Sequence, residues 1–429
     1  MKRWAQSVVI LAMAMCIGAP AIAADEISYK VVAGDTLTGF GGKYLKRQAD
    51  YRIVQKRNGI RNPKRIPVGT ILKVPRSILK YEPASARLSA VRGDVMAVVD
   101  GEARAARTGQ TLSEGNALKT SGGAFASLQL DDGSRISVPS NTDIRILRLR
   151  RYLLGSALDY DFQVDRGGAR SKVAPLKSAN DRYQVRTPRA VSAVRGTDFQ
   201  TRFDTDNNRD FAEVDEGGLA IELEKGVTRA LPAGNGLAVA ADGSSFTEAL
   251  LPPLDIAGAG KLQNGATVRF ALPSAANARI SIAKDASFEE QVADRIASDG
   301  AVDFGNLDDG NYFLRARAIA PSGIEGLPAT YAFKRRLNSV SGSAGAADEG
   351  WVFKWGGEGR GVIRYNFQLF RGDIKGVPLV DETGLEAQQI ILSDLTDGEY
   401  HWRVGSVQYL DGEASANWTA FEKLTVAAN

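Results

Sequence analysis

Hydrophobic and polar positions alternate with a period of two along most of the chain, and this pattern predicts a protein built mainly from short β-strands. Residues 87–247 hold the longest series, in which alternating segments are separated by turns containing Gly or Asp. Within 126–138, two alternating halves flank Asp131-Asp132-Gly133-Ser134. An Asp-Gly turn between such halves predicts a hairpin.

A second hairpin is predicted for residues 145–165, where three arginines precede three aspartates: Arg145, Arg148, Arg150; Asp159, Asp161, Asp165. Strict alternation places the aspartates on one face and the apolar residues of the same segment on the other. With a turn centred on Gly155-Ser156, Arg150 would face Asp161. The arginines are therefore interpreted as cross-strand partners of the acids, each pair contributing a few tenths of a kcal/mol.

Residues 28–79 have a different pattern, in which alternating segments at 29–32 and 70–74 flank two helical stretches. The first predicted helix, 37–45, follows Asp35 or Thr36 as the capping residue. Its three glycines weaken it by up to about 1 kcal/mol each relative to Ala. The second, 50–57, ends at Asn58-Gly59, which tolerates a left-handed conformation. The pattern predicts a β-α-α-β module.

The last two regions, 251–338 and 346–429, form an internal repeat. Leu-Asp-Asp-Gly-Asn-Tyr at 307–312 matches Leu-Thr-Asp-Gly-Glu-Tyr at 395–400, at an offset of 88 residues. A period of this length is typical of duplicated β-sandwich domains. The composition of 339–345 predicts a flexible spacer between the two, and 80–86 is interpreted as a linker after the β-α-α-β module.

The charge is concentrated in that module. The whole chain has 54 Lys or Arg against 50 Asp or Glu, a net +4, but residues 29–79 contain twelve basic residues against two acidic ones. Residues 1–23 are predicted to be a signal peptide, with Lys2 and Arg3, an apolar run at 8–17 and the small residues of 21–23. Without this segment the chain carries +2, and residues from 80 onward carry about −6.

The single cysteine, Cys16, lies within the predicted signal, so the processed chain is expected to lack disulfides, thiolate metal sites and a cysteine nucleophile. The apolar run is too short to span a bilayer, and no later stretch approaches the roughly 18 apolar residues that a spanning helix needs. We expect an exported periplasmic protein without a transmembrane span.

The β-α-α-β segment resembles the LysM family in the order and spacing of its motifs: Val31, 34–37, 43–45, 58–60, Asn62-Pro63, Ile66 and 69–75. The resemblance implies binding of peptidoglycan or another N-acetylglucosamine-containing glycan in a shallow groove between two loops. It implies contacts from main-chain groups and an apolar floor formed by residues such as Leu37 and Ile60. The implied site residues are Gly34, Asp35, Thr36, Leu37, Asn58, Gly59, Ile60, Arg61, Asn62 and Ile66.

Two alternatives compete with glycan binding for this module. In the first, its residues only build a small core, and its charge only keeps the module soluble. The basic charge could also meet nucleic acid, but export and the scarcity of aromatic residues among the basic ones argue against that partner.

Residues from about 87 to 240 resemble the FecR domain in 91–95, 109–120, 128–134, 185–188, 194–199 and 214–217. Some members of that family are sensors that relay a signal through a membrane helix to a sigma factor. This chain lacks that helix, so only the extracytoplasmic all-β module is implied. The acidic segment Asp204 to Asp215 imitates a calcium loop, but Arg209 occupies the position that requires Gly, so a hydrated hairpin tip is the favoured interpretation.

In the two C-terminal regions, Leu-x-x-Gly-x-Tyr resembles the tyrosine corner of fibronectin type III or immunoglobulin-like sandwiches, whose phenol bonds back to the main chain. Tyr400, Trp402 and Val404 are predicted to face a core. Four tryptophans lie in the last region, where core packing is favoured over stacking on sugars: Trp351, Trp355, Trp402 and Trp418.

The single histidine, His401, is predicted on the exposed side of a strand, which argues strongly against a Ser-His-Asp triad. One histidine also argues strongly against a multi-histidine metal site. A carboxylate pair could still hydrolyse glycans, but nothing in the sequence identifies one. We therefore predict a non-catalytic envelope protein without cofactor or metal, which binds glycan through residues 28–79 and protein or envelope partners through its β domains. The alternatives are a sensing module that acts with a separate membrane protein and a glycan hydrolase. The specific glycan, the protein partners and the oligomeric state stay open.

Overall fold

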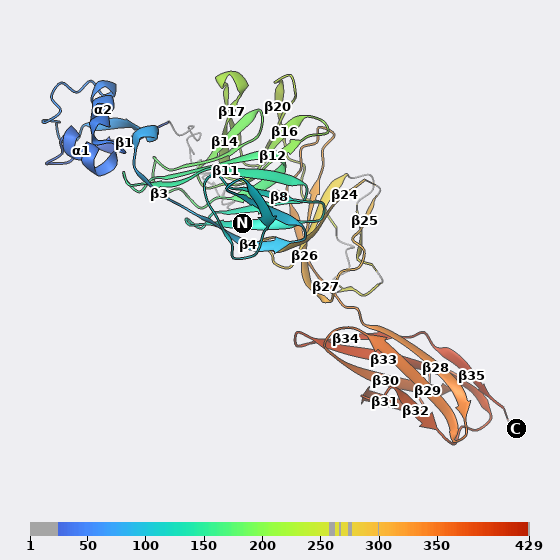
Figure 1. Ribbon diagram of the computed structural model, residues 1–429. Helices are drawn as coiled ribbons and strands as arrows, with labels where there is room; N and C mark the ends of the chain where they lie inside the picture. Colours follow the sequence, from blue (N-terminus) through green and yellow to red (C-terminus); the bar gives the residue numbers. More distant parts are fainter. Residues whose placement is uncertain (1–24, 257–261, 266, 273–276, 299, 428–429) are drawn as a thin grey trace, which may run out of the picture. The chain divides into compact units, whose positions relative to one another are not determined.

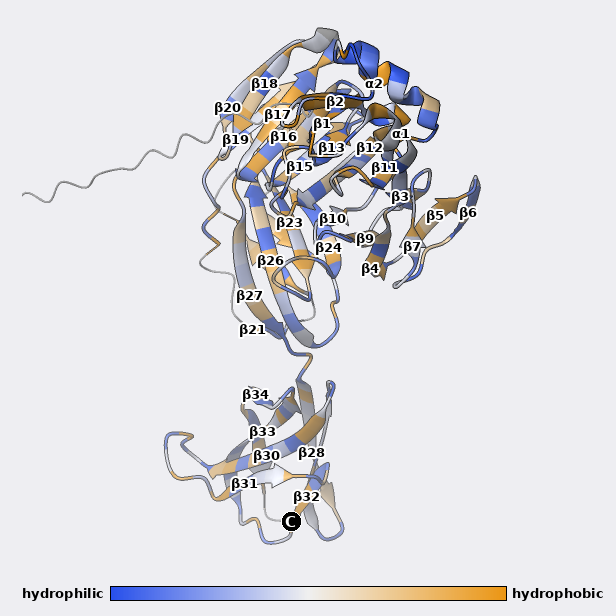
Figure 2. Ribbon diagram, turned by 90° about the vertical axis from the view of Figure 1, so that its left-hand side faces the viewer, coloured by the Kyte–Doolittle hydropathy of each residue, from blue (hydrophilic) through white to orange (hydrophobic). Residues whose placement is uncertain are grey.

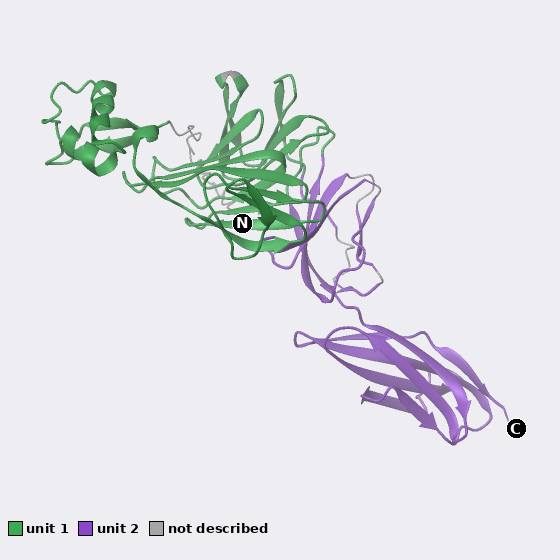
Figure 3. Ribbon diagram, viewed as in Figure 1, with its two compact units in different colours: residues 1–251, 320–327 green, residues 252–319, 328–429 purple. Residues whose placement is uncertain are grey.

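The computed structural model describes residues 25–427 except 257–261, 266, 273–276 and 299. The described residues form mostly strands with two α-helices, which confirms a multidomain, mainly β fold (Figure 1). They divide into two compact units, residues 1–251 with 320–327 and residues 252–319 with 328–429 (Figure 3). The predicted signal peptide and Cys16 lie outside the described residues.

The first unit begins with the expected β-α-α-β module. Its elements are β1 (Glu26–Lys30), α1 (Leu37–Tyr44), a 3-10 turn (Gln48–Asp50), α2 (Tyr51–Arg57), β2 (Ile71–Pro75) and a second 3-10 turn (Arg76–Ile78). Strands β1 and β2 pair antiparallel. Thr36 is the cap of α1, since its hydroxyl accepts a hydrogen bond from the Gly39 amide. Gly41 is required where α1 meets the 3-10 turn, because an added Cβ would lie 2.6 Å from the Gln48 carbonyl oxygen.

Eighteen strands follow in the same unit: β3 (Tyr81–Pro83), β4 (Ala86–Arg92), β5 (Val95–Val99), β6 (Glu102–Ala105), β7 (Thr111–Leu112), β8 (Ala117–Thr120), β9 (Phe125–Leu130), β10 (Arg135–Val138), β11 (Thr142–Tyr152), β12 (Leu158–Lys172), β13 (Arg182–Arg186), β14 (Ala190–Val194), β15 (Asp198–Asp204), β16 (Arg209–Glu216), β17 (Gly218–Leu223), β18 (Thr228–Pro232), β19 (Asn235–Val239) and β20 (Ser245–Ala249). A 3-10 turn (Glu224–Gly226) precedes β18. The hairpin expected within 126–138 is present as β9 and β10.

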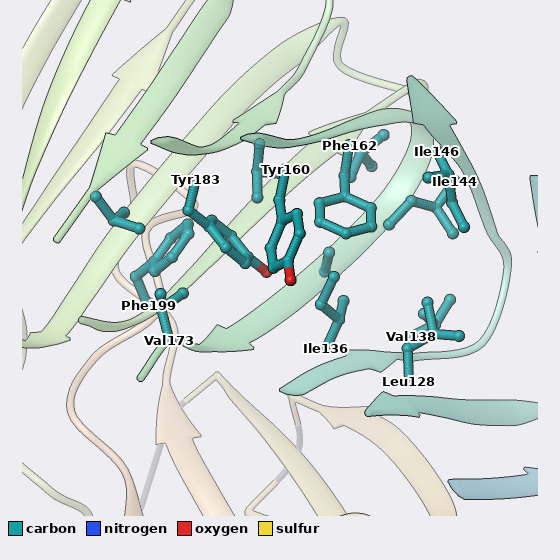
Figure 4. Packing of buried hydrophobic residues seen from close by; sticks show 14 of the residues in the cluster. Leu128, Ile136, Val138, Ile144, Ile146, Tyr160, Phe162, Val173, Tyr183 and Phe199 are labelled. Atoms are coloured by element: carbon teal, nitrogen blue, oxygen red, sulfur yellow. The ribbon is translucent and has the colours of Figure 1, made fainter. Parts of the chain in front are cut away.

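Strand β12 joins two sheets. Its first half pairs antiparallel with β11 and parallel with β13, whereas its second half pairs with β10 and β15. Apolar side chains from both sheets meet in one buried cluster, which includes Phe162, Tyr183 and Phe199 (Figure 4). Burying this apolar surface, at about 25 cal/mol per Å², is the main stabilising contribution to the region.

The segment 320–327 completes the first unit. Ile324 packs with Phe211 in a small apolar cluster. Arg202 donates a hydrogen bond to the Gly323 carbonyl, and Glu325 is buried with its amide bonded to Glu213.

The prediction of a linker at 80–86 is wrong. Part of this segment is strand β3, which pairs antiparallel with β11. Ala84 and Ala86 are buried, and the Ala84 amide donates to the Leu149 carbonyl. The alternation of small apolar residues in this segment allows it to run along a sheet, so it continues the sheet.

The β11–β12 hairpin has the predicted strands but a shifted register. Arg148 faces Asp161 and Arg150 faces Asp159, so the predicted pairing of Arg150 with Asp161 is wrong by two residues. The turn lies one residue earlier in the chain than expected, since the Tyr152 amide bonds to the Ala157 carbonyl.

The second unit begins with two sheets built from β21 (Leu262–Gln263), β22 (Arg269–Ala271), β23 (Ala278–Ala283), β24 (Gln291–Ala297), β25 (Ala301–Asp303), β26 (Gly310–Ala318) and β27 (Ala329–Arg335). The five-stranded sheet has the order β21-β27-β26-β23-β24, and β22 pairs with β25. Orange and blue residues alternate along β26 (Figure 2), and its apolar residues enter a separate core with Phe270 and Phe333.

Two further sheets close the chain. One has the order β28 (Ser339–Ala347), β29 (Gly350–Glu358) and β32 (Gln389–Leu392). The other contains β30 (Val362–Arg371), β31 (Val380–Leu385), β33 (Gly398–Leu410), β34 (Glu413–Trp418) and β35 (Glu422–Val426). Tyr400, Trp402 and Val404 are buried in their shared core, as predicted.

The predicted flexible spacer at 339–345 is also wrong, because these residues belong to β28, which pairs along its whole length with β29. The small residues make room for a large neighbour. A Cβ added to Gly342 would lie 2.9 Å from the Trp402 ring. Glycine here allows close packing, which explains a composition that otherwise suggests flexibility.

Both predicted tyrosine corners are present. The Tyr312 hydroxyl donates to the Asp308 carbonyl at 3.0 Å, and the Tyr400 hydroxyl donates to the Thr396 carbonyl at 2.7 Å. The same four-residue backward bond therefore recurs at the 88-residue offset seen in the sequence.

Candidate functional site

All but one of the residues predicted to bind a ligand lie on two loops of the β-α-α-β module, which we call the first loop (33–36) and the second loop (58–66). The exception, Leu37, is the first residue of α1. A main-chain hydrogen bond of 2.9 Å from the Leu37 amide to the Pro63 carbonyl joins the end of the first loop to the middle of the second. Residues separated by more than twenty positions in the sequence are thereby held side by side.

The first loop is shaped by Asp35. Its carboxylate accepts hydrogen bonds from the Tyr29 hydroxyl and the Val32 amide, each at 2.8 Å. Burial together with the bond to Asp35 raises the pKa of Tyr29 to about 12, so this phenol stays a donor at neutral pH. Gly34 precedes Asp35 with φ of 89°, a conformation that favours glycine. Asp35 therefore holds the loop in shape.

The second loop is fastened by Asn58. Its amide nitrogen donates to the carbonyls of Val54 and Lys73, and its amide oxygen accepts from the Lys73 main chain. These bonds tie the end of α2 to β2. Gln55 holds Ile60 in the same way, accepting from the Ile60 amide with its main chain and donating to the Ile60 carbonyl with its side chain.

Burial separates the predicted site residues into two groups. Leu37 is 0% exposed and Ile66 is buried, and both pack in the core of the module. The expectation that the Leu37 side chain forms an apolar floor is therefore wrong, because a ligand cannot reach it. Ile60 is half-buried and is the apolar side chain of this set that a ligand can touch.

The remaining members of the set lie at or near the surface: Gly34, Gly59, Arg61 and Asn62 are exposed, and Asp35, Thr36 and Asn58 are half-buried. Two ordered loops that present main-chain groups around one half-exposed aliphatic side chain can hydrogen-bond acetamido groups and pack on the apolar face of a sugar ring. We call this surface the groove of the two loops, after the shallow groove that the sequence resemblance implies.

The predicted set omits two charged residues beside the groove, Lys64 and Arg65, which are exposed on the second loop. The sequence feature that indicates these two residues is the basic run Arg61-Asn62-Pro63-Lys64-Arg65. The net charge of the module includes this run but does not locate it on the second loop.

The module is docked on the β11–β12 hairpin. Tyr152, Leu154 and Ala157 from the hairpin tip are buried in the core cluster of the module itself. Asn180 exchanges two hydrogen bonds with the main chain of Ser28, each at 3.0 Å, and so continues the edge of β1.

A buried ion-pair network supports this docking. Arg182 binds Asp159 through two hydrogen bonds and also binds Asp25 next to β1. Burial acts to raise the pKa of Asp159, but its bonds to Arg182 hold that pKa below the usual range. Asp159 and Asp161, which alternation placed on the face opposite the apolar residues, are fully buried under arginines.

The segment Asp204 to Asp215 comprises the end of β15, the hairpin tip at 205–208 and most of β16. Asp204 accepts hydrogen bonds from the amides of Asp206 and Asn207 in the turn. Asp210 and Asp215 lie on β16, where they pair with Arg189 and Arg170. These carboxylates thus face different partners, and no group of metal-binding side chains occurs among the residues that the structure describes.

Two protein families match parts of the chain. The model of the LysM domain matches residues 29–75, and the model of the FecR protein matches residues 116–220. No curated protein matches the chain.

Similarity to solved structures is weak. A proposed anti-sigma factor from Parabacteroides distasonis shares 16% identity over 31% of this chain and 59% of its own length, with a TM-score of 0.27. The FN1–FN3 domains of chicken CNTN1 share 9% identity over 66% of this chain and 98% of theirs, with a TM-score of 0.22. At these scores the likeness carries no inference about function.

In the part of the chain that the structure describes, every helix is too short or too polar to cross a membrane.

Proposed function

We propose that this protein is a non-catalytic component of the bacterial cell envelope that binds N-acetylglucosamine-containing glycan, peptidoglycan in particular, through the groove of the two loops. The observation that carries the proposal is the bond from Leu37 to Pro63, which brings both loops together within the segment matched by the LysM domain. Gly34, Asp35, Thr36, Asn58, Gly59, Ile60, Arg61 and Asn62 surround the ligand, while Leu37 and Ile66 contribute their main chains and support the loops from below.

The test is retention of the purified protein on insoluble peptidoglycan. An Ile60→Ser variant removes the half-exposed aliphatic surface and leaves the main-chain bonds of Ile60 in place. We expect it to weaken retention roughly tenfold, the effect of losing about 1.4 kcal/mol of contact. The matched control is Ile53→Ser, the same change at a position that is 44% exposed on α2.

Equal retention of the wild type and the Ile60→Ser variant would contradict the proposed groove. Loss of retention in the Ile53→Ser control would show that the module binds through another surface.

The non-catalytic character has its own measurement. Incubation with peptidoglycan should release no soluble muropeptides above a protein-free control. The protein would be a hydrolase instead if the Ile60→Ser variant still released muropeptides and if substitution of an Asp or Glu abolished that release.

A second candidate function is sensing together with a separate membrane protein, and the match of the FecR protein to residues 116–220 favours it. In this alternative the two sheets around β12 bind the partner, while the two C-terminal sheet pairs act as sandwiches of the fibronectin type III or immunoglobulin-like kind. Cross-linking in the envelope of the producing cell distinguishes the candidates. A specific membrane-protein adduct through residues 87–247 supports sensing, and adducts to glycan alone support anchoring.

A further inference from the structure

The second loop carries a cluster of positive charge that the proposed function does not yet use. Arg61, Lys64 and Arg65 are all exposed within five residues of one another. Among the residues that the structure describes, no ion pair involves any of the three. Elsewhere in the module, Arg47 and Arg57 are paired with acidic residues. The three residues of the second loop differ from the other basic residues because they lie together on a loop of the candidate site.

The acidic residues of the module, and those just before it in the chain, already bind other groups of the protein. Glu26 pairs with Arg57 at 2.6 Å, and Asp50 pairs with Arg47 at 3.0 Å. Asp25 binds Arg182 of the neighbouring sheet. Asp35, the acid of the groove, is occupied by the Tyr29 hydroxyl and the Val32 amide. The excess positive charge therefore has no internal counter-charge near the second loop.

The turn that carries the cluster is ordered. The Asn62 side chain accepts a hydrogen bond from the Lys64 amide at 3.0 Å, and the Asn62 carbonyl accepts from the Arg65 amide at 3.2 Å. The following carbonyl, that of Pro63, receives the Leu37 amide from the other loop. The same short turn thus contacts the end of the first loop and presents the three basic side chains to solvent.

We propose that Arg61, Lys64 and Arg65 bind carboxylates attached to the glycan that occupies the groove, so that the protein selects an anionic N-acetylated polymer over a neutral one. This inference rests on the proposed glycan-binding function and adds the charge class of its ligand. Arginine suits this task because its planar fork can hold a carboxylate through two parallel hydrogen bonds. The partner that fits is a glycan strand with acidic substituents, such as the peptide carboxylates of peptidoglycan.

The experiment compares one polymer in two charge states. Full-length protein is bound to insoluble peptidoglycan before and after its carboxyl groups are converted to neutral amides, and to a soluble neutral N-acetylglucosamine oligomer. The test variant is Arg61→Gln/Lys64→Gln/Arg65→Gln. The matched control, Lys30→Gln/Arg52→Gln/Lys73→Gln, removes the same charge from exposed positions on β1, α2 and β2.

We expect the wild type and the control variant to bind the native polymer roughly tenfold more tightly than the amidated one, since three exposed charge contacts of a few tenths of a kcal/mol or more combine to this order. The test variant should bind both forms equally, and its affinity for the neutral oligomer should equal that of the wild type. The preference should shrink between about 0.1 M and 1 M salt, as screening removes exposed charge contacts.

Three outcomes would overturn the inference: an unchanged preference in the test variant, an equal loss in the control variant, or equal binding of native and amidated polymer by the wild type. Failure of the wild type to bind any of the three ligands would instead refute the proposed function. Equal thermal unfolding midpoints of the variants establish that the comparison concerns folded protein.

Discussion

At the scale of single residues, Asp210 illustrates how surroundings set a charge. Its side chain is buried on β16 and accepts a hydrogen bond from the Arg189 amide at 2.8 Å. Burial outweighs this bond and raises the pKa of Asp210 to about 6. The folded protein therefore binds a proton at Asp210 at a pH where the unfolded chain has already lost it.

The sign of the pH dependence follows from the raised pKa. Between about pH 4 and pH 6 the folded state holds more protons at this site than the unfolded state, so the contribution of Asp210 to stability falls as the pH rises and is then constant. An Asp210→Asn variant lacks this penalty. The free energy of unfolding of the variant minus that of the wild type should therefore increase by on the order of 2–3 kcal/mol as the pH rises from 4 to 7.

Denaturant unfolding of both proteins at several pH values measures this difference. Asp206→Asn, the same change on the exposed hairpin tip, serves as control. A stability difference for Asp210→Asn that does not change with pH would contradict the prediction.

Individual side chains were predicted best where their partners lie nearby in the sequence. The cap at Thr36 and the turn at 131–134 depend on neighbours within a few residues. The burial of Asp159 and Asp161 depends on β13, which runs parallel to β12 and brings Arg182 and Arg186 over them. Alternation within one strand carries no information about such a neighbour.

At the scale of elements, the tip of the β11–β12 hairpin has an unexpected place. Leu154 is 1% exposed and belongs to the core of the β-α-α-β module, whereas its neighbour Leu153 is 41% exposed. Alternation in the sequence predicts the hairpin and a turn at its tip, but it does not predict that the apolar residues of the tip enter another core. Two adjacent leucines with opposite surroundings offer a direct test.

Leu154→Ala should destabilise the module by about 2–5 kcal/mol, because it removes buried methyl groups and leaves a cavity. Amide hydrogen exchange in α1 and α2 should accelerate as a result. Leu153→Ala should leave exchange unchanged. Equal exchange in the two variants would mean that the hairpin tip does not support the module.

Element predictions failed where composition was taken as evidence of flexibility. The segments 80–86 and 339–345 both contain small residues, and both form paired strands. In the second, Gly342 accommodates Trp402. Small residues mark close packing as well as freedom, and the identity of the packing partner decides between the two.

At the scale of the whole molecule, the β-α-α-β module cannot be removed without consequence for the first unit. Deleting residues 28–79 would uncover Tyr152, Leu154 and Ala157 and would remove the bonds from Ser28 to Asn180. We expect the unfolding midpoint of the remaining β-sheets to fall by several degrees, because buried apolar surface becomes exposed.

Deletion of residues 346–429 provides the comparison for this prediction, since these residues belong to the second unit. The first unit should unfold in that variant as it does in the full chain. An unchanged midpoint after deletion of 28–79 would show that the module is only tethered. For this reason point variants, and not the deletion, are the appropriate test of glycan binding.

The docking of the module also has a mechanical consequence. A pull on a sugar held by the two loops would reach the β-sheets along two routes at once, through the peptide chain at β3 and through the hairpin tip with Asn180. Tension shared between two parallel routes loads each less than a single tether would be loaded. Movement of a bound glycan relative to the protein would thus be transmitted directly to β11 and to β12, the strand that joins the two sheets.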